Sequence, residues 1–147
     1  MHLSLCICAL IPRLQIRKSL CLILHKDELR KPTNTGRLAA RAVEGSSILV
    51  HGHEEERVQA PNFVGRRPLV LFADEKAAPL TAAHANGLPV TLVVPDGTWR
   101  QADKMRRRIP WLRDVPNVTL PAGLATAYNL RAESKARGLA TAEAIAR

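Results

Sequence analysis

An acidic residue follows a predicted buried strand at the place where α/β proteins hold their ligands. Residues 90–94 form a continuous apolar run, and Asp96 is expected in the turn between this strand and a segment of helical periodicity. Ligands of α/β proteins bind outside the carboxyl ends of parallel strands, beside a helix N-terminus. An exposed carboxylate at this point is placed to abstract a proton. The alternative interpretation is that Asp96 only caps the helix.

The segment after Asp96 predicts a basic helix. Thr98 and Gln101 have the spacing of a capping box, in which each side chain pairs with a backbone N–H of the first turn. Apolar side chains recur at helical period along one face: Trp99, Ala102, Met105 or Arg106, and Ile109. The opposite face carries four cations: Arg100, Lys104, Arg107 and Arg108. Charge runs are usually solvated faces, but this density of cations favours contact with RNA phosphates.

The composition of the whole chain also favours a polyanionic partner. The sequence holds 22 Lys and Arg against 13 Asp and Glu, which gives a formal charge of +9 and a pI near 10.3. Nucleic acid is therefore expected ahead of a membrane surface. The 46% apolar content excludes a disordered chain, and the 3% aromatic content argues against an RNA reader built on stacked aromatic platforms.

Chain length and cysteine content indicate the number of domains and the location of the protein. The 147 residues suffice for one domain, and three cysteines cannot build a disulfide framework, so a reducing, cytoplasmic location is expected. No apolar run reaches the length of a membrane span, because Arg13, Arg17 and Lys18 interrupt the first candidate. The apolar N-terminus lacks the cationic start and small-residue cleavage site of a signal peptide.

Strands and helices are predicted to alternate around the basic helix. Buried strands are predicted at residues 20–24, 69–72 and 90–94, with a weaker fourth at 47–50. Ala-rich helices are predicted at residues 36–43 and 77–85, the second closed by Asn86 and Gly87. Continuous apolar runs are typical of a sheet that is covered on both faces. The sequence therefore predicts an α/β domain with a mostly parallel sheet and flanking helices.

Four ordered blocks carry a resemblance to a known family. The most specific is Asp96-Gly97-Thr98-Trp99, which is followed by Arg100, Gln101 and Ala102. The upstream block contains His25, Glu28 and the run Asn34-Thr35-Gly36-Arg37, and two closing blocks lie at residues 128–131 and 141–144. Together they cover about residues 6–146. In this pattern the chain resembles the DTW-domain family of tRNA-uridine aminocarboxypropyltransferases.

The resemblance implies a fold and a reaction. The fold is SPOUT-like, with a knotted cofactor site near the C-terminus. The reaction moves the 3-amino-3-carboxypropyl group of S-adenosylmethionine to N3 of a uridine in tRNA, which gives acp3U and methylthioadenosine. Asp96 is the candidate base. Since a free Asp has a pKa of about 3.9, burial beside Trp99 is expected to raise it; alternatively, Asp96 only orients the reacting groups.

The resemblance also implies a set of residues around the cofactor: Leu71, Phe72, Gly97, Trp99, Tyr128, Leu130, Arg131, Thr141 and Glu143. Trp99 would line the cofactor pocket or be an ordinary residue of the hydrophobic core. Arg131 would bind the carboxylate of the methionine moiety. Thr141 and Glu143 would border the adenosine or the methionine amine. By the residues alone, Thr141 is a helix N-cap with Glu143 in the first turn.

The upstream residues are expected to have a substrate-side or structural role: His25, Glu28, Asn34, Thr35 and Arg37. Their spacing fits no common zinc pattern. The family is thought to bind a structural zinc ion through further cysteines before Cys6 and Cys8, which are absent here. Two thiolates supply half of a tetrahedral site, which argues against zinc, and Cys21 lies in a predicted buried strand. We therefore expect a DTW domain over residues 1–147 that is truncated at both ends.

Two other interpretations stay open. The chain could use S-adenosylmethionine to transfer a methyl group, or to modify ribosomal RNA. It could also be a catalytically inactive remnant that binds RNA through its basic face, in which case tRNA binding would depend on salt and not on Asp96.

Overall fold

Six parallel strands form the centre of the molecule. The computed structural model describes residues 6–53, 57–74, 76–121 and 139–147. Within them the strands are β1 (Ser19–His25), β2 (Ser47–His51), β3 (Arg67–Leu71), β4 (Ala78–Pro79), β5 (Val90–Asp96) and β6 (Asn117–Thr119). Their order in the sheet is β2-β1-β5-β3-β6-β4, and every pairing is parallel. The prediction of an α/β fold with a parallel sheet is confirmed.

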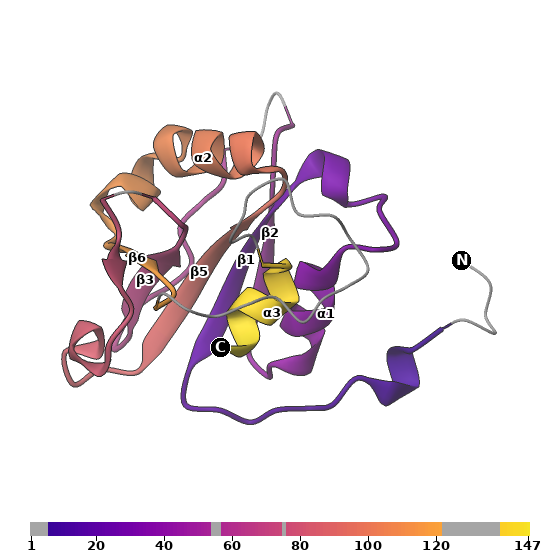
Figure 1. Cartoon of the computed structure of the whole chain (residues 1–147), viewed down its shortest axis with the longest axis horizontal. Coiled ribbons are helices and arrows are strands. Elements are labelled where there is room, and N and C mark those ends of the chain that lie inside the picture. The colour runs from indigo at the N-terminus through magenta and orange to yellow at the C-terminus, as the bar shows by residue number, and fades with distance from the viewer. Residues whose placement is uncertain (1–5, 54–56, 75, 122–138) are drawn as a thin grey trace.

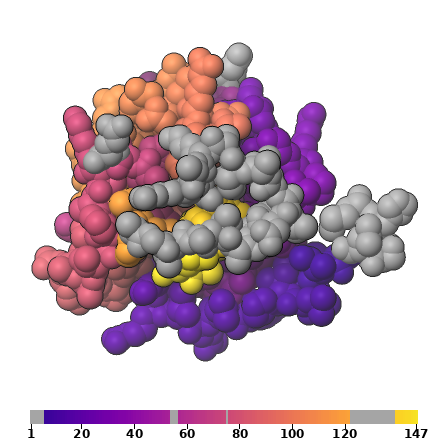
Figure 2. Space-filling model, viewed as in Figure 1, coloured from indigo at the N-terminus to yellow at the C-terminus, as the bar shows by residue number. Residues whose placement is uncertain are grey.

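Helices cover both faces of this sheet (Figure 1). The α-helices are α1 (Thr35–Ala42), α2 (Trp99–Arg108) and α3 (Thr141–Ala146). The described residues also form four short 3₁₀ helices: η2 (Cys8–Leu10), η3 (Lys26–Glu28), η4 (Ala82–Ala85) and η5 (Pro110–Asp114). In Figure 2, α2 runs along the upper rim of one face and the N-terminal residues along the lower rim, with α3 between them.

The apolar run of β1 faces two separate cores, because successive side chains of a strand point to opposite faces. Leu20, Leu22 and Leu24 pack in one core, to which Ala40 of α1 and Ala144 of α3 also belong. The other core contains side chains of β1, of β5 and of the segment from α2 to η5: Cys21, Ile23, Val93, Ala102, Met105, Ile109 and Leu112. A strand between two helical layers must be apolar on both sides, which explains its unbroken run of aliphatic residues.

The chain leaves β1 and β5 in opposite directions. From β1 it passes through α1 to β2 on one side, and from β5 it passes through α2 to β6 on the other. Because β1 and β5 are neighbours, their carboxyl ends form a topological switch point, where open α/β sheets bind ligands. His25 ends β1 and Asp96 ends β5, so the predicted upstream block and the predicted turn meet here.

One predicted helix is wrong. Residues 77–85 contain the short strand β4, which pairs with β6, and then only the 3₁₀ turn η4. Pro79 explains the difference, since a proline inside a helix lacks the N–H for its hydrogen bond and clashes with the preceding turn. The predicted end of the segment is correct, because Asn86 and Gly87 have positive φ angles of 47° and 75°.

The described helices are all too short or too polar to cross a membrane. The knot near the C-terminus stays a prediction.

Candidate functional site

Asp96 is the last residue of β5 and is only 5% exposed. The prediction that it is an exposed residue in the turn is wrong. The reason is that β1 continues to pair with β5 as far as the partners Leu24 and Asp96, so the strand extends through Pro95. The carboxylate is thereby enclosed at the switch point between β1 and β5.

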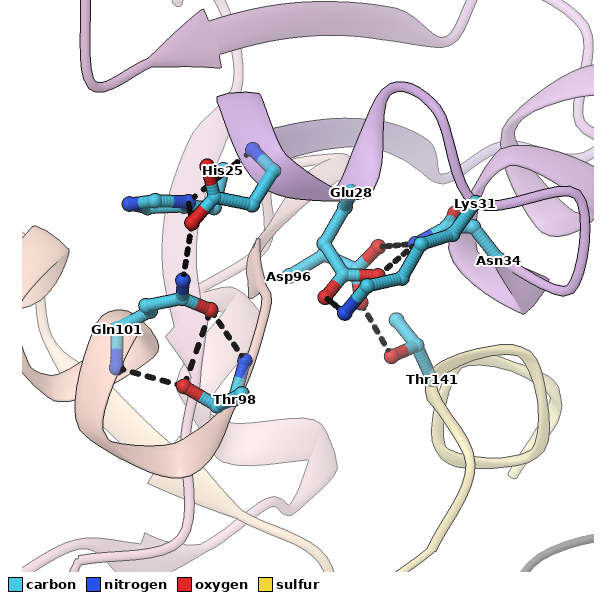
Figure 3. A network of polar contacts seen from close by, with 9 residues as sticks. His25, Glu28, Lys31, Asn34, Asp96, Thr98, Gln101 and Thr141 are labelled. Atoms are coloured by element: carbon cyan, nitrogen blue, oxygen red, sulfur yellow. Dashed lines mark hydrogen bonds and ion pairs between the residues drawn. The ribbon is translucent and has the colours of Figure 1, made fainter.

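Two side chains from distant parts of the chain donate hydrogen bonds to the Asp96 carboxylate (Figure 3). The Asn34 Nδ2 lies 2.7 Å from Oδ2, and the Thr141 Oγ1 lies 2.6 Å from Oδ1. Asn34 precedes α1 and Thr141 begins α3. The carboxylate therefore links the two helices of one face to the end of β5.

The alternative that Asp96 caps α2 is wrong. Thr98 is the N-cap, and it forms the predicted capping box with Gln101. The Gln101 N–H donates to the Thr98 Oγ1 at 3.3 Å, and the Thr98 N–H donates to the Gln101 Oε1 at 2.8 Å. Because Thr98 and Gln101 cap the N-terminus of α2, Asp96 takes no part in capping this helix.

A second buried carboxylate lies beside Asp96. Glu28 is 5% exposed, and its Oε2 accepts a 3.3 Å bond from the same Asn34 Nδ2. Lys31 Nζ is 2.6 Å from the other oxygen, Oε1, and forms an ion pair with Glu28. The Asn34 amide is fixed in orientation because its Oδ1 accepts the Arg37 N–H at 3.0 Å. One amide thus caps α1 and bridges two acids (Figure 3).

Burial raises the pKa of Asp96, and the negative charge of Glu28 adds to this effect. The hydrogen bonds from Thr141 and Asn34 act in the opposite direction, as does the charge of Lys31, but the net change of the pKa is upward. Among the described residues, no cationic side chain forms an ion pair with Asp96 within 4 Å. The site therefore holds a buried acid whose pKa is closer to neutral than that of a free Asp.

Thr141 is not the N-cap that the sequence predicts. Ala140 is the N-cap of α3 and makes no side-chain capping bond, whereas Thr141 is the first helical residue. Its hydroxyl is used on Asp96, a contact that no local pattern could reveal. The second residue of α3, Ala142, donates its N–H to the Thr35 Oγ1 at 3.3 Å. Glu143 lies in the first turn as predicted and accepts a 2.9 Å bond from Arg147.

Gly36 and Lys31 complete the site and were not predicted as site residues. A Cβ on Gly36 would lie 2.6 Å from the Asp96 Oδ2, closer than real Cβ contacts come. A glycine in the first turn of a helix costs stability, so its position in the sequence is the signal of a close approach.

His25 belongs to a second polar network, at the start of α2 (Figure 3). Its Nδ1 accepts the Asp27 N–H at 3.3 Å, and the Asp27 Oδ2 accepts a 2.9 Å bond from the Gln101 Nε2. Gln101 of the α2 capping box is thus hydrogen-bonded to Asp27 of η3. His51 is the register partner of His25 in β2, and burial together with the nearby His25 and Arg108 lowers the pKa of His51.

Among the predicted cofactor residues, Phe72 and Trp99 meet. Their ring centroids are 5.8 Å apart, and the Arg106 guanidinium lies 5.6 Å from the centroid of Phe72. Arg106 also pairs with Asp74 at 2.6 Å, so Met105 is the residue that completes the apolar stripe of α2. Trp99 is half-buried, and Leu71 lies in the core. Tyr128, Leu130 and Arg131 lie outside the described residues.

The basic face of α2 is at the surface. Its four predicted cations are all exposed: Arg100, Lys104, Arg107 and Arg108. Arg107 forms an ion pair with Asp103 of the same helix. The geometry expected for this face is therefore present, whereas RNA binding by it stays a prediction.

A zinc ion does not fit the cysteines that the structure describes. Cys6 and Cys8 are exposed and Cys21 is buried in β1. No group of three or more His, Cys, Asp or Glu side chains is arranged around a metal position within the described ranges. Asp96 and Glu28 are buried carboxylates, and their negative charge would favour a cationic ligand at this end of the sheet.

The comparison with protein families decides the relationship of the chain. The family described as DTW domain matches residues 1–147. The chain belongs to the DTW domain family. The match includes the Asp96–Trp99 tetrapeptide and the residues that surround the Asp96 carboxylate. Membership of the DTW domain family is consistent with a tRNA-modifying transferase activity. No solved structure matches this DTW domain.

Proposed function

We propose that this DTW domain transfers the 3-amino-3-carboxypropyl group of S-adenosylmethionine to N3 of a uridine in tRNA. The products are acp3U and methylthioadenosine. We expect the reaction in the cytoplasm, because three cysteines provide no disulfide framework. The observation that carries the proposal is the buried Asp96 carboxylate, fixed by Asn34 and Thr141 at the switch point of the sheet.

Asp96 is proposed to accept the N3 proton. Uridine N3 is a poor nucleophile while it is protonated, and a positioned base removes this obstacle. Among the described residues, each oxygen of Asp96 accepts one hydrogen bond, and a second lone pair on each oxygen can take a proton. The raised pKa of Asp96 makes it a stronger base than a free Asp, and the fixed Asn34 and Thr141 donors hold the carboxylate in one orientation.

The cofactor would be held by Phe72 and Trp99 together with Thr141 and Glu143. When it is bound, its sulfonium activates the adjacent methylene carbon, so that the C–S bond breaks as the N3–C bond forms and the electron pair stays on sulfur. The negative charge of Asp96, which forms no ion pair among the described residues, favours a cationic cofactor nearby. The exposed cations of α2 would contact the tRNA backbone.

Nucleoside mass spectrometry tests the proposal. The protein is incubated with an unmodified tRNA transcript and S-adenosylmethionine, beside the variants Asp96→Asn and Glu44→Gln. Glu44 is an exposed carboxylate away from the site, so it controls for the loss of one charge. We expect acp3U from the wild type and from Glu44→Gln, and a loss of at least about a hundredfold in Asp96→Asn, the usual scale of general base catalysis.

The other outcomes separate the alternatives. A methylated nucleoside would assign a methyl transfer instead. A folded protein that binds tRNA without forming any adduct would identify an RNA-binding remnant. Full acp3U formation by Asp96→Asn would show that the carboxylate is not the base.

A further inference from the structure

A cavity of about 570 Å³ opens at the far end of α2 from Asp96. It lies between the last turn of α2, the helix η5 and the start of β6, and its lining contains none of the residues that contact Asp96. Apolar side chains form part of its wall, including Leu112 and Val115. The volume falls within the range of small-molecule pockets, so the cavity can take a group of the size of one nucleotide.

The rim of the cavity is basic. Arg107 and Arg113 both line it, and the Arg113 Nε donates to the Arg107 carbonyl oxygen at 3.1 Å, which holds the two residues together. Arg107 is paired with Asp103, whereas Arg113 has no ion pair within the described part of the chain. Asp114 also lines the cavity and is exposed. The Nη atoms of Arg113 are therefore available to an anion.

Asn117 adds a polar group to the wall. Its Oδ1 is buried and has no hydrogen-bond partner among the residues described. Buried polar atoms are nearly always paired, so this unpaired oxygen is an exception among the residues described. The amide of Asn117 is the kind of group that pairs with the edge of a base, since it carries both donors and an acceptor.

The cavity is continuous with the basic face of α2, because Arg107 belongs to both. From the cap Thr98 beside the site to Arg107 is about 14 Å along the helix axis, at 1.5 Å per residue. A nucleic acid strand that crosses this face therefore connects the Asp96 end of α2 to the cavity within a few nucleotides.

We propose that this cavity binds a second nucleotide of the RNA substrate, near the modified uridine. The phosphate lies against Arg113 and Arg107, and the base lies against Val115 and Pro116, beside Asn117. This subsite deepens the proposed function and rests on an RNA substrate. Since it lies off the catalytic centre, it contributes affinity and the choice of sequence around the target rather than the chemical step.

Binding of an unmodified tRNA transcript, measured by fluorescence anisotropy over a series of KCl concentrations, tests the subsite. The variants are Arg113→Gln, which removes the free cation, and Val115→Phe, which fills the cavity without a change of charge. Arg13→Gln is the matched control, because Arg13 is an exposed cation of the N-terminal segment. Thermal melting verifies that each variant is folded.

We expect Arg113→Gln to weaken binding by about threefold or more and to reduce the slope of log K against log salt by about 1. Val115→Phe should weaken binding with an unchanged slope, and Arg13→Gln should change neither. The proposal would be overturned if Arg113→Gln had the same affinity and salt slope as Arg13→Gln. It would also be overturned if a folded Val115→Phe bound the tRNA with full affinity. If Val115→Phe does not fold, Arg113→Gln decides. Formation of acp3U by the wild type is a separate readout, so the reaction and the subsite can fail independently.

Discussion

The Asp96 carboxylate has an environment that is unusual for an acid. It is buried, and it has a second acid as its neighbour through Asn34. Among the described residues, the donors to its two oxygens are both neutral. Burial without a paired cation disfavours the charged form, which is why the pKa rises despite both hydrogen bonds. The same environment that makes Asp96 a better base also makes its ionisation a cost to the folded state.

This cost predicts a pH-dependent stability. The folded pKa of Asp96 is raised, so its contribution to stability is present below the unfolded value of about 3.9 and is lost as the pH rises through the folded value. Asp96→Asn cannot titrate. We therefore expect the melting temperature of the wild type to fall relative to Asp96→Asn as the pH increases from about 4, measured by calorimetry. A constant difference between the two proteins across this window would contradict a raised pKa.

At the scale of the elements, the site depends on how closely α1 approaches the end of β5. Gly36 allows this approach, since its missing Cβ would meet the Asp96 Oδ2 at 2.6 Å. The Asn34 cap fixes where α1 begins, and the Thr98 capping box fixes where α2 begins, one on each side of the switch point. The helix starts are thus set by local sequence, and the distance between the elements by a glycine.

Gly36→Ala tests this approach. In an open helix position the change stabilises a protein by up to about 1 kcal/mol. Here we expect a loss of stability of about 1–3 kcal/mol, because the added methyl displaces Asp96 or shifts α1, and acp3U formation should fall with it. Urea unfolding measures the sign of the effect. A stabilised variant with full activity would show that the carboxylate does not need this contact.

Over the whole molecule, the sequence predicts strands better than it predicts contacts. The four predicted strands are present because unbroken aliphatic runs indicate strands buried on both faces, as in β1. The hydrogen-bond partners of Asp96 could not be predicted, since Asn34 and Thr141 are 62 and 45 residues away in the chain. Likewise, the helix expected at residues 77–85 was wrong because the Ala-rich pattern outweighed Pro79 in the prediction.

Thr141 connects the C-terminal helix to the centre of the sheet, so its loss should have an effect beyond one hydrogen bond. Thr141→Val keeps the shape and removes the donor to Asp96, which should cost about 1–3 kcal/mol. We expect faster amide hydrogen exchange over residues 141–146, with β1 unchanged, in mass spectrometry of the exchanged protein. The exposed Thr33→Val is the control. If α3 exchanged its amide hydrogens equally slowly in both variants, apolar packing alone would hold α3 in place.

Each of the two tryptophans belongs to a different aromatic pair in the described part of the chain. Trp99 contacts Phe72 at the start of α2, whereas Trp111 contacts Phe63 at 5.8 Å and donates its Nε1 to the Val58 carbonyl oxygen at 2.9 Å. The sequence contains no other tryptophan. Trp111→Phe would therefore leave a single tryptophan in the protein, three residues after the proposed catalytic carboxylate. Its emission gives an optical signal for the arrival of a cofactor without any attached label.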